Sequence, residues 1–286
     1  MTIQNLEIKE IIAKSILVTS KLPECDFVIN PYTGCRFGCS YCYASFMGRF
    51  VNKNISDWGD YVYAKINAPE LLKKEIVKLK DKGKGKTILL SSVTDPFQGI
   101  EAKYKLSYKC LKVLADYGFE GEVSILTKSP LVMKSLPILK KLKNVDVGLT
   151  ITSTDDKISR YFEKFAPSAS QRLETLKKLN EEGIKTYAFF GPLLPHFVAN
   201  KEEIKKVLDA IYQTGTRRLF VEHINLSKYI KDRMIEELKD ADNDFLEKFY
   251  FSQSKDYREE LNKMILELLK EYDFELLHEI IYHKEN

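Results

Sequence analysis

Three cysteines, Cys35, Cys39 and Cys42, lie close together in a C-x3-C-x2-C arrangement. Cysteine thiolates are the usual ligands of iron–sulfur clusters. Gly34 and Gly38 permit positive φ angles, so the backbone can wrap tightly around a compact group. Three cysteines would hold three irons of a 4Fe–4S cubane and leave the fourth iron open to another ligand. This spacing therefore predicts a cluster with a chemical role beyond electron transfer.

A zinc site is the main alternative for these cysteines. Structural zinc takes four nitrogen or sulfur ligands, often from paired C-x2-4-C units. Cys39 and Cys42 could form one such half, but Cys25 and Cys110 stand apart, and only the last two of the four histidines are close in sequence. A non-catalytic iron–sulfur protein or a zinc-binding protein is therefore the alternative to an enzyme.

The composition is that of a globular protein. Of the 286 residues, 44% are apolar and 30% are charged, and the net charge is +4. That balance permits nucleic-acid binding without requiring it. No run approaches the roughly 18 apolar residues of a membrane span, and the first ten residues lack the order of a signal peptide. We therefore expect no membrane contact and a cytoplasmic protein, in which thiols stay reduced.

Short apolar stretches alternate with longer amphipathic ones. The expected strands are 27–30, 87–91, 123–127, 145–152, 185–190 and 218–221. The expected helices between them are 68–82, 106–117, 131–142, 170–182 and 201–212, with Pro137 able to kink the third. This alternation predicts βαβ units and a parallel sheet, either closed as a barrel or open and doubly wound.

The sequence changes character after about residue 225. Charged, helical patterns cover 227–239, 244–251 and 255–271, and 274–282 fits a last strand or helix. Charges of both signs alternate there, which favours a solvated face over a nucleic-acid-binding one. We predict a core at 1–225 and a mainly helical C-terminal extension at 226–286, packed on the core.

The cysteine loop resembles a known family. It is similar to the radical S-adenosylmethionine (SAM) signature C-x3-C-x-φ-C, with Tyr41 as the aromatic φ. Its context, Asn-Pro-Tyr-Thr-Gly-Cys followed by Tyr-Cys-Tyr-Ala, resembles the spore photoproduct lyase-like branch, which is labelled DNA repair photolyase-like. The resemblance extends over roughly residues 25–225.

This resemblance implies a fold and a chemistry. The fold is a partial (β/α)6 barrel of the TIM type, which selects the barrel over the open sheet. The implied cofactors are a 4Fe–4S cluster and SAM, and an external electron donor such as flavodoxin or ferredoxin is the implied partner. Reductive cleavage of SAM would give a 5′-deoxyadenosyl radical that abstracts hydrogen from a substrate not yet identified. A nucleic-acid-linked substrate is left open.

The resemblance also implies roles for residues near the expected strand ends. Tyr41 would pack beside the adenine of SAM. Ser92, Thr94 and Asp95 would lie beside its methionine moiety, where hydroxyls and a carboxylate suit an amino acid. Their alternative role is a capping turn before Pro96.

Two further groups follow the later strands. Lys128 and Ser129 are similar to a contact with the SAM carboxylate, and an exposed lysine is the alternative. Thr150 and Thr152 lie on one side of their strand and would suit ribose hydroxyls, although threonine is also common in strands.

Two more segments of this chain resemble stretches of the same branch. Arg172 would either reach SAM or form a surface ion pair with Glu163. The segment 191–195 resembles a backbone stretch that borders adenine, and it also fits a rigid loop.

The sequence departs from spore photoproduct lyase at one place. That enzyme returns hydrogen to its product from a cysteine near the end of its second strand, whereas 91–96 here reads Ser-Ser-Val-Thr-Asp-Pro. We expect Cys110 to lie in the core, and Cys25 to lie in the core or in a pocket. Repair of dipyrimidine lesions is therefore not supported.

Overall fold

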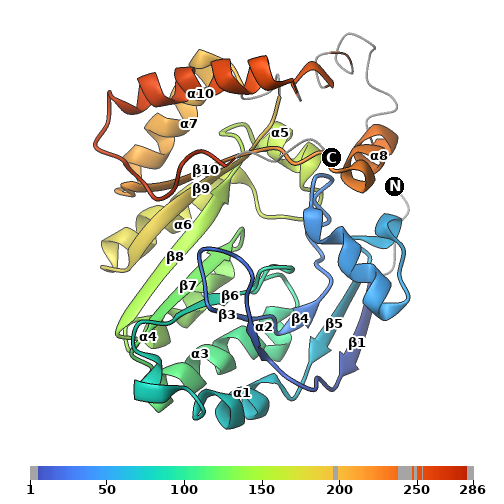
Figure 1. Ribbon diagram of the computed structural model, residues 1–286, viewed down its shortest axis with the longest axis vertical. Coiled ribbons are helices and arrows are strands. Elements are labelled where there is room, and N and C mark those ends of the chain that lie inside the picture. Colours follow the sequence, from blue (N-terminus) through green and yellow to red (C-terminus); the bar gives the residue numbers. More distant parts are fainter. Residues whose placement is uncertain (1–5, 196–198, 238–246, 248–249, 253, 282–286) are drawn as a thin grey trace.

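The computed structural model describes residues 6–195, 199–237, 247, 250–252 and 254–281. Its centre is a sheet in the order β11-β10-β9-β8-β7-β6-β3-β2 (Figure 1). The six inner strands run parallel and are β3 (Phe27–Ile29), β6 (Thr87–Leu90), β7 (Glu122–Thr127), β8 (Asn144–Ile151), β9 (Lys185–Leu193) and β10 (Arg218–His223). All six strands expected from the sequence are thus confirmed.

The sheet has two edges in the described part of the chain. At one edge β2 (Leu17–Thr19) pairs antiparallel with β3, and at the other β11 (Glu275–Leu276) pairs parallel with β10. The described strands form an open, mostly parallel sheet and not a closed barrel.

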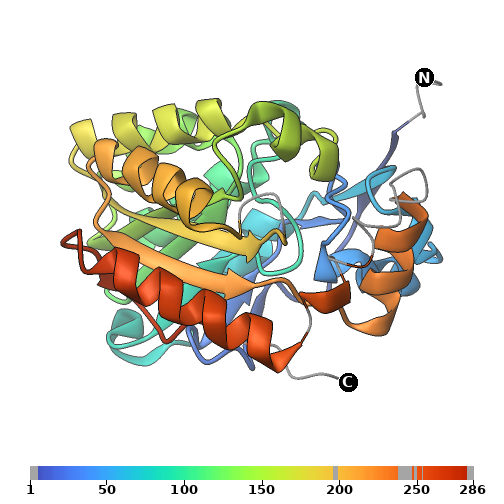
Figure 2. The ribbon, with the colours of Figure 1, turned by 90° about the horizontal axis from the view of Figure 1, so that it is seen from above.

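Helices cover the outer face of this sheet. They are α1 (Ala68–Ile76), α3 (Leu106–Tyr117), α4 (Leu136–Leu139), α6 (Ala169–Glu181), α7 (Lys201–Gln213) and α10 (Lys255–Leu269). Figures 1 and 2 show α6, α7 and α10 side by side, and α6 packs on β8 and β9. Alternate strand residues such as Val123, Ile125 and Leu149 are fully buried on this face and form the main core.

Local signals fix the helix ends. Ser168 and Gln171 form a capping box at the start of α6, and Gly118 ends α3 with a φ of 71°. No helix in the described residues is long and apolar enough to cross a membrane.

Two expected helices are shorter than predicted. The helix at 68–82 ends at Ile76, because Leu79 is extended and Asp81 and Lys82 have positive φ in the 3-10 turn η3 (Lys80–Gly83). The segment 131–142 divides into η4 (Pro130–Ser135) and α4, and Pro137 stands in the first turn of α4. A proline is tolerated there because the first turn needs no N–H donor.

A small second sheet was not predicted. It has the order β1-β5-β4, from β1 (Glu7–Ile11), β5 (Tyr61–Lys65) and β4 (Tyr32–Thr33). Four short helices were also not predicted. Two of them, η1 (Tyr43–Val51) and η2 (Ile55–Asp57), lie between the cysteines and β5. The others, α2 (Glu101–Tyr104) and α5 (Asp156–Phe162), follow β6 and β8. Of these elements, α5 and β5 contact the cysteine loop, through the Phe162 carbonyl and through Tyr61.

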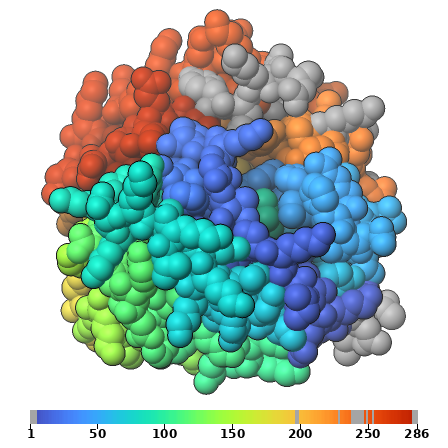
Figure 3. All heavy atoms as spheres, turned by 60° about the horizontal axis from the view of Figure 1, so that its bottom comes forward, coloured from blue at the N-terminus to red at the C-terminus, as the bar shows by residue number. Residues whose placement is uncertain are grey.

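The last residues return to the sheet. The expected helices at 227–239 and 255–271 correspond to α8 (Lys228–Glu237) and α10, and the end of the chain adds β11. The helix expected at 244–251 lies mostly outside the described residues. Figure 3 shows a blue segment from the N-terminal part of the chain beside the red C-terminal segment, and Cys25 and Ile281 line one cavity.

Candidate functional site

The cysteine loop lies between β4 and η1. Cys35 and Cys39 are buried, and Cys42 is half-buried. Gly34 has a φ of +83°, and a Cβ on it would lie 2.4 Å from the backbone oxygen of Tyr61 in β5. A glycine is therefore required for the loop to pack this closely against β5.

Two polar side chains that follow β6 fix the backbone on both sides of Cys35. The Thr94 hydroxyl donates to the Gly34 carbonyl at 2.6 Å, and the Gln98 amide donates to the same carbonyl at 3.2 Å. The Gln98 carbonyl accepts from the Arg36 N–H at 2.8 Å. Gln98 is fully buried, and no motif in the sequence marks it.

The Cys39 end of the loop is held by elements from later in the chain. The Ser40 N–H donates to the carbonyl of Phe162, the last residue of α5, at 2.8 Å. The guanidinium of Arg233 in α8 donates to the Gly38 carbonyl at 3.2 Å. No local sequence pattern marks either contact, because both join segments more than a hundred residues apart.

The three thiols lie in a dry environment with cations nearby. Burial raises the pKa of Cys35 well above its ordinary value, that of Cys39 to about 12, and that of Cys42. Lys128 opposes this shift at Cys39 and Cys42, and Arg233 opposes it at Cys42. Thiols that are protonated in the free protein must release protons when they bind a metal.

The donor set fits an iron–sulfur cluster. It consists of three thiols on one fixed loop with positive side chains around them, which suits an anionic group ligated by thiolates. Among the described side chains, no three His, Cys, Asp or Glu converge on a single metal position. A cubane does not need such a point, because each of its irons takes its own ligand.

A buried charge network lies beside the loop, and we call Tyr41, Lys128, Ser159, Glu163 and Arg172 the Glu163 network. The Glu163 carboxylate is fully buried and accepts from the Tyr41 hydroxyl, the Ser159 hydroxyl at 2.9 Å and the Arg172 guanidinium. The Lys128 ammonium lies 3.9 Å from it and 5.8 Å from the centre of the Tyr41 ring. Burial raises the pKa of Glu163, but Arg172 and Lys128 outweigh it and lower that pKa below the usual value.

Arg172 pairs with Glu163, but the pair is not on the surface. Both side chains are fully buried, because α6 presents Arg172 to the end of β8. The guanidinium also donates to the backbone oxygens of Pro167 at 2.9 Å and Thr150 at 3.2 Å. Arg172 therefore joins α5, α6 and β8 from within.

Asp95 and Ser129 also have partners within the protein. The Asp95 carboxylate accepts from the Thr127 hydroxyl at 2.7 Å and the Lys128 N–H at 2.8 Å, and burial raises its pKa. The Ser129 hydroxyl caps η4 by accepting from the Leu131 N–H at 3.2 Å. These bonds tie the loop after β6 to the end of β7.

The remaining expected site residues differ in their hydrogen bonding. Ser92 and Asn30 bond to each other twice, through the Ser92 N–H at 3.0 Å and its hydroxyl at 3.4 Å. Thr150 and Thr152 are both buried at the end of β8. The Thr152 hydroxyl has no hydrogen-bond partner among the described residues. A buried polar atom of this kind calls for a partner such as a water, an ion or a ligand.

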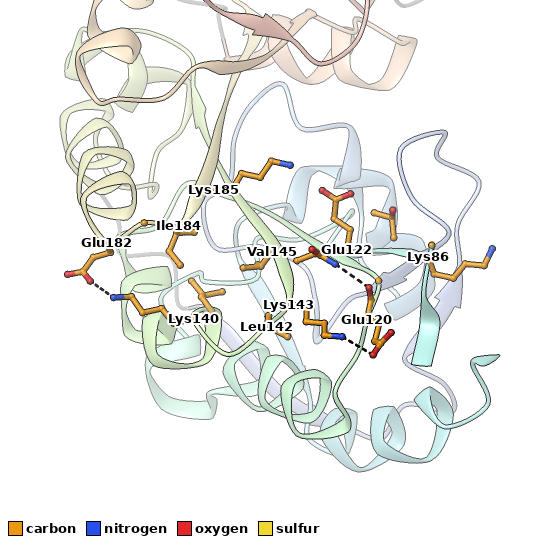
Figure 4. Close-up of a pocket in the computed structure, with 16 residues that line it drawn as sticks. Lys86, Glu120, Glu122, Lys140, Leu142, Lys143, Val145, Glu182, Ile184 and Lys185 are labelled. Atoms are coloured by element: carbon orange, nitrogen blue, oxygen red, sulfur yellow. Dashed lines mark hydrogen bonds and ion pairs between the residues drawn. The ribbon is translucent and has the colours of Figure 1, made fainter. Parts of the chain in front are cut away.

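Two hollows lie at opposite ends of the sheet. Figure 4 shows the larger, of about 910 Å³, whose walls include Lys86, Glu120, Lys143 and Lys185 at the amino ends of the strands. The smaller, of about 400 Å³, which we call the inner cavity, lies on the inner face of the sheet and reaches Tyr43, next to Cys42. In parallel sheets, active sites lie beyond the carboxyl ends of the strands, so of these two hollows the smaller one lies nearer the cysteine loop.

Several known proteins are similar to this chain. The family model of the Radical SAM superfamily matches residues 29–211. An uncharacterized protein of Methanocaldococcus jannaschii is 39% identical over 193 residues, covering 68% of this chain and 70% of that protein. An uncharacterized protein of Acidianus two-tailed virus is 28% identical over 260 residues, covering 86% of this chain and 80% of that protein.

Two solved structures share the fold. Spore photoproduct lyase complexed with dinucleoside spore photoproduct matches with a TM-score of 0.72 at 14% identity, over 95% of this chain and 82% of that one. SuiB of Streptococcus suis bound to S-adenosylmethionine matches with a TM-score of 0.50 at 15% identity, over 87% of this chain and 48% of that one. Together with the family match, which covers more than half of the residues, this means that the chain belongs to the radical SAM superfamily of enzymes.

Proposed function

We propose that this protein holds a 4Fe–4S cluster on Cys35, Cys39 and Cys42 and uses it to cleave SAM for hydrogen abstraction from a substrate. The observation that carries the proposal is the cysteine loop itself: three buried or half-buried thiols held by Gln98 and Thr94. When bound, the cluster would supply the electron that divides SAM into methionine and a 5′-deoxyadenosyl radical. Flavodoxin or ferredoxin is the kind of donor we propose to reduce it.

We infer that the six parallel strands form the partial (β/α)6 barrel of the family, with the cysteine loop at its carboxyl end. We also retain a core at 1–225 and a mainly helical extension at 226–286. The packing of α10 on α7 and the pairing of β11 with β10 support an extension that covers the last strands.

Four side chains, besides Ser92, are proposed to contact SAM. Lys128 lowers the pKa of Cys39 against the effect of burial, and its ammonium would attract the SAM carboxylate. The Thr152 hydroxyl, with Thr150 beside it, would bond to ribose hydroxyls. Tyr41, whose ring lies under Lys128, would pack beside the adenine.

The other expected residues are proposed to position these four. Asp95 and Ser129 hold the backbone around Lys128, and Arg172 orients Glu163, which in turn holds Tyr41 and Lys128. Thr94 fixes the cysteine loop. Ser92 bonds to Asn30, and we keep it as a fifth contact, to the methionine moiety.

Anaerobic reconstitution tests this function. The wild-type protein should bind four irons and four acid-labile sulfides, and dithionite plus SAM should then release 5′-deoxyadenosine. Cys39→Ala should lose both signals, whereas Cys110→Ala should keep them, because Cys110 is buried within α3 away from the loop.

Two results would overturn the proposal. One is a tightly held zinc without acid-labile sulfide in anaerobically purified protein, which would support a zinc-binding protein. The other is a protein that carries a full cluster but releases no 5′-deoxyadenosine from SAM, which would support a non-catalytic iron–sulfur protein.

A further inference from the structure

Trp58 is the only tryptophan in the sequence, and it directly follows the short helix η2. The segment that contains it is fixed to the cysteine loop. A Cβ on Gly59 would lie only 3.0 Å from the Cα of Gly38, and the Arg36 guanidinium donates to the Gly59 carbonyl at 2.8 Å. Trp58 is therefore held beside the loop by backbone contacts that its own side chain does not make.

The indole of Trp58 is buried. Its ring meets that of Tyr61 edge to face at 6.2 Å, and both rings belong to the same core cluster as Cys35 and Cys39. The indole N–H has no hydrogen-bond partner among the described residues. A buried donor that lacks an acceptor costs free energy, so its position beside the cysteines calls for an explanation.

The indole N–H acts on the sulfur of Cys42. Burial raises the pKa of Cys42, and the Ala44 backbone N–H and the Trp58 indole N–H are among the groups that oppose this rise by favouring the thiolate. A neutral thiol is a weak acceptor, whereas a thiolate accepts a stronger, charge-assisted hydrogen bond. A cysteine that ligates a metal is a thiolate. The buried donor of Trp58 thus gains an acceptor when Cys42 is a ligand.

We propose that the indole N–H of Trp58 donates to the Cys42 sulfur when that cysteine holds the cluster, and that this bond raises the reduction potential of the cluster. The inference rests on the proposed function and adds to it a residue that tunes the cluster. Hydrogen bonds to the sulfurs are one means by which a protein sets this potential. The electron that reduces the cluster adds negative charge to it, so the bond stabilises the reduced form more than the oxidised form. The bond makes the cluster easier for flavodoxin or ferredoxin to reduce.

Replacement of the indole by rings of the same shape tests the proposal. Because Trp58 is the only tryptophan, an analogue supplied during expression enters the chain at this one position. The analogue 3-benzothienylalanine keeps the bicyclic ring but has sulfur in place of the N–H, whereas 5-fluorotryptophan keeps the N–H and serves as the matched control. Redox titration of each reconstituted protein, followed by electron paramagnetic resonance, measures the midpoint potential of its cluster.

The potential should fall only where the N–H is lost. At the potential where the wild-type cluster is half reduced, the benzothienyl protein should have a ratio of reduced to oxidised cluster about three- to tenfold lower. A tenfold change corresponds to about 59 mV for a one-electron couple. The fluorotryptophan protein should stay close to the wild type. Trp58→Phe should shift the potential in the same direction as the benzothienyl protein.

An equal or higher midpoint potential in the benzothienyl protein would overturn the proposal. A fall in Trp58→Phe alone would also overturn it, because the packing of the ring and not its N–H would then set the potential. The proposed function is judged on other evidence. A wild-type protein that binds no iron and sulfide overturns both proposals. A wild-type protein with a full cluster that releases no 5′-deoxyadenosine overturns the proposed function alone, since the potential of its cluster can still be measured.

Discussion

The Glu163 network and the inner cavity flank the same cysteine loop, and they are built in opposite ways. In the network, the charged groups of Glu163 and Arg172 are fully buried and joined by direct hydrogen bonds. In the cavity, carbon surfaces dominate, and Glu24 and Glu222 are the charged side chains of its described lining. Many polar contacts fix the Glu163 network, whereas the cavity is an apolar space that a ligand could fill.

This difference indicates a division of tasks. Groups locked by a satisfied network hold their neighbours in one geometry, which is what an invariant cofactor needs. An apolar cavity with few polar groups selects by shape and charge, which is what a variable substrate needs. The two regions should therefore respond differently to substitution.

The largest effect is expected in the network. Glu163→Gln should lower the free energy of unfolding by about 3–5 kcal/mol, because it leaves the buried Arg172 without its counter-charge. Urea unfolding measures the loss. Glu174→Gln is the control, since its pair with Lys178 is exposed and should contribute less than about 1 kcal/mol. Equal losses in the two variants would remove the distinction between the network and the surface.

Acid should have the same effect as this substitution. The pKa of Glu163 is lowered in the folded protein, so its contribution is complete above the usual value of 4.5. It is lost as the pH falls through the lowered folded value. The stability difference between wild type and Glu163→Gln should therefore shrink as the pH falls below 4.5, in unfolding curves measured at several pH values. A stability difference that grows on acidification would contradict a lowered pKa of Glu163 in the folded protein.

Two neighbours on β7 allow a matched comparison of core and cavity. Ile125 is fully buried on the outer face, whereas Leu126 lines the inner cavity. Ile125→Ala should cost about 2–5 kcal/mol, and Leu126→Ala should cost clearly less because its side chain already borders a space. Thermal and urea unfolding of both variants provide the test. A larger loss for Leu126→Ala would mean that the cavity wall is ordinary core.

A smaller effect is expected at the loop support. Thr94→Val removes the hydroxyl that donates to the Gly34 carbonyl and should destabilise the protein by about 1–3 kcal/mol. It should lower the iron content after reconstitution but leave the SAM affinity of the loaded fraction near that of wild type. Normal iron content with weakened SAM binding would instead make Thr94 a direct SAM contact.

The smallest effect is expected at Thr152. Thr152→Val removes a buried hydroxyl that has no partner among the described residues, so the free energy of unfolding should not fall. SAM should bind about two- to tenfold more weakly, as expected for one lost hydrogen bond. Thr175→Val is the control, because that hydroxyl donates to the Gln171 carbonyl at 2.7 Å and should affect stability without affecting SAM. Unchanged SAM affinity in Thr152→Val would exclude this contact.

The regular part of this fold could be predicted from the sequence. The six parallel strands have runs of β-branched and aromatic residues, and α3, α6 and α7 have glycine or polar signals at their ends. The small sheet gave no such signal, because β1 reads as a charged, exposed segment and gains its place only by pairing with β5. Short helices such as α5 likewise depend on tertiary contacts.

The candidate site was predictable only where chemistry and spacing coincide. The cysteine spacing marks the loop, but nothing local marks Gln98, Ser159 or Arg233, which bond to it or to its neighbours across the fold. The burial of the Glu163–Arg172 pair and the position of Cys25 on a cavity wall also follow from packing and not from sequence. Residues that hold a site from a distance leave no pattern in the chain.

The most direct test of the account is the effect of SAM on the reduced cluster. Electron paramagnetic resonance should show one 4Fe–4S signal in the reduced, reconstituted wild-type protein and a changed signal when SAM is added, because three cysteines leave one iron open to it. If SAM leaves the signal unchanged in protein with full iron and sulfide content, the cluster on this loop does not bind SAM, and the proposed function is wrong.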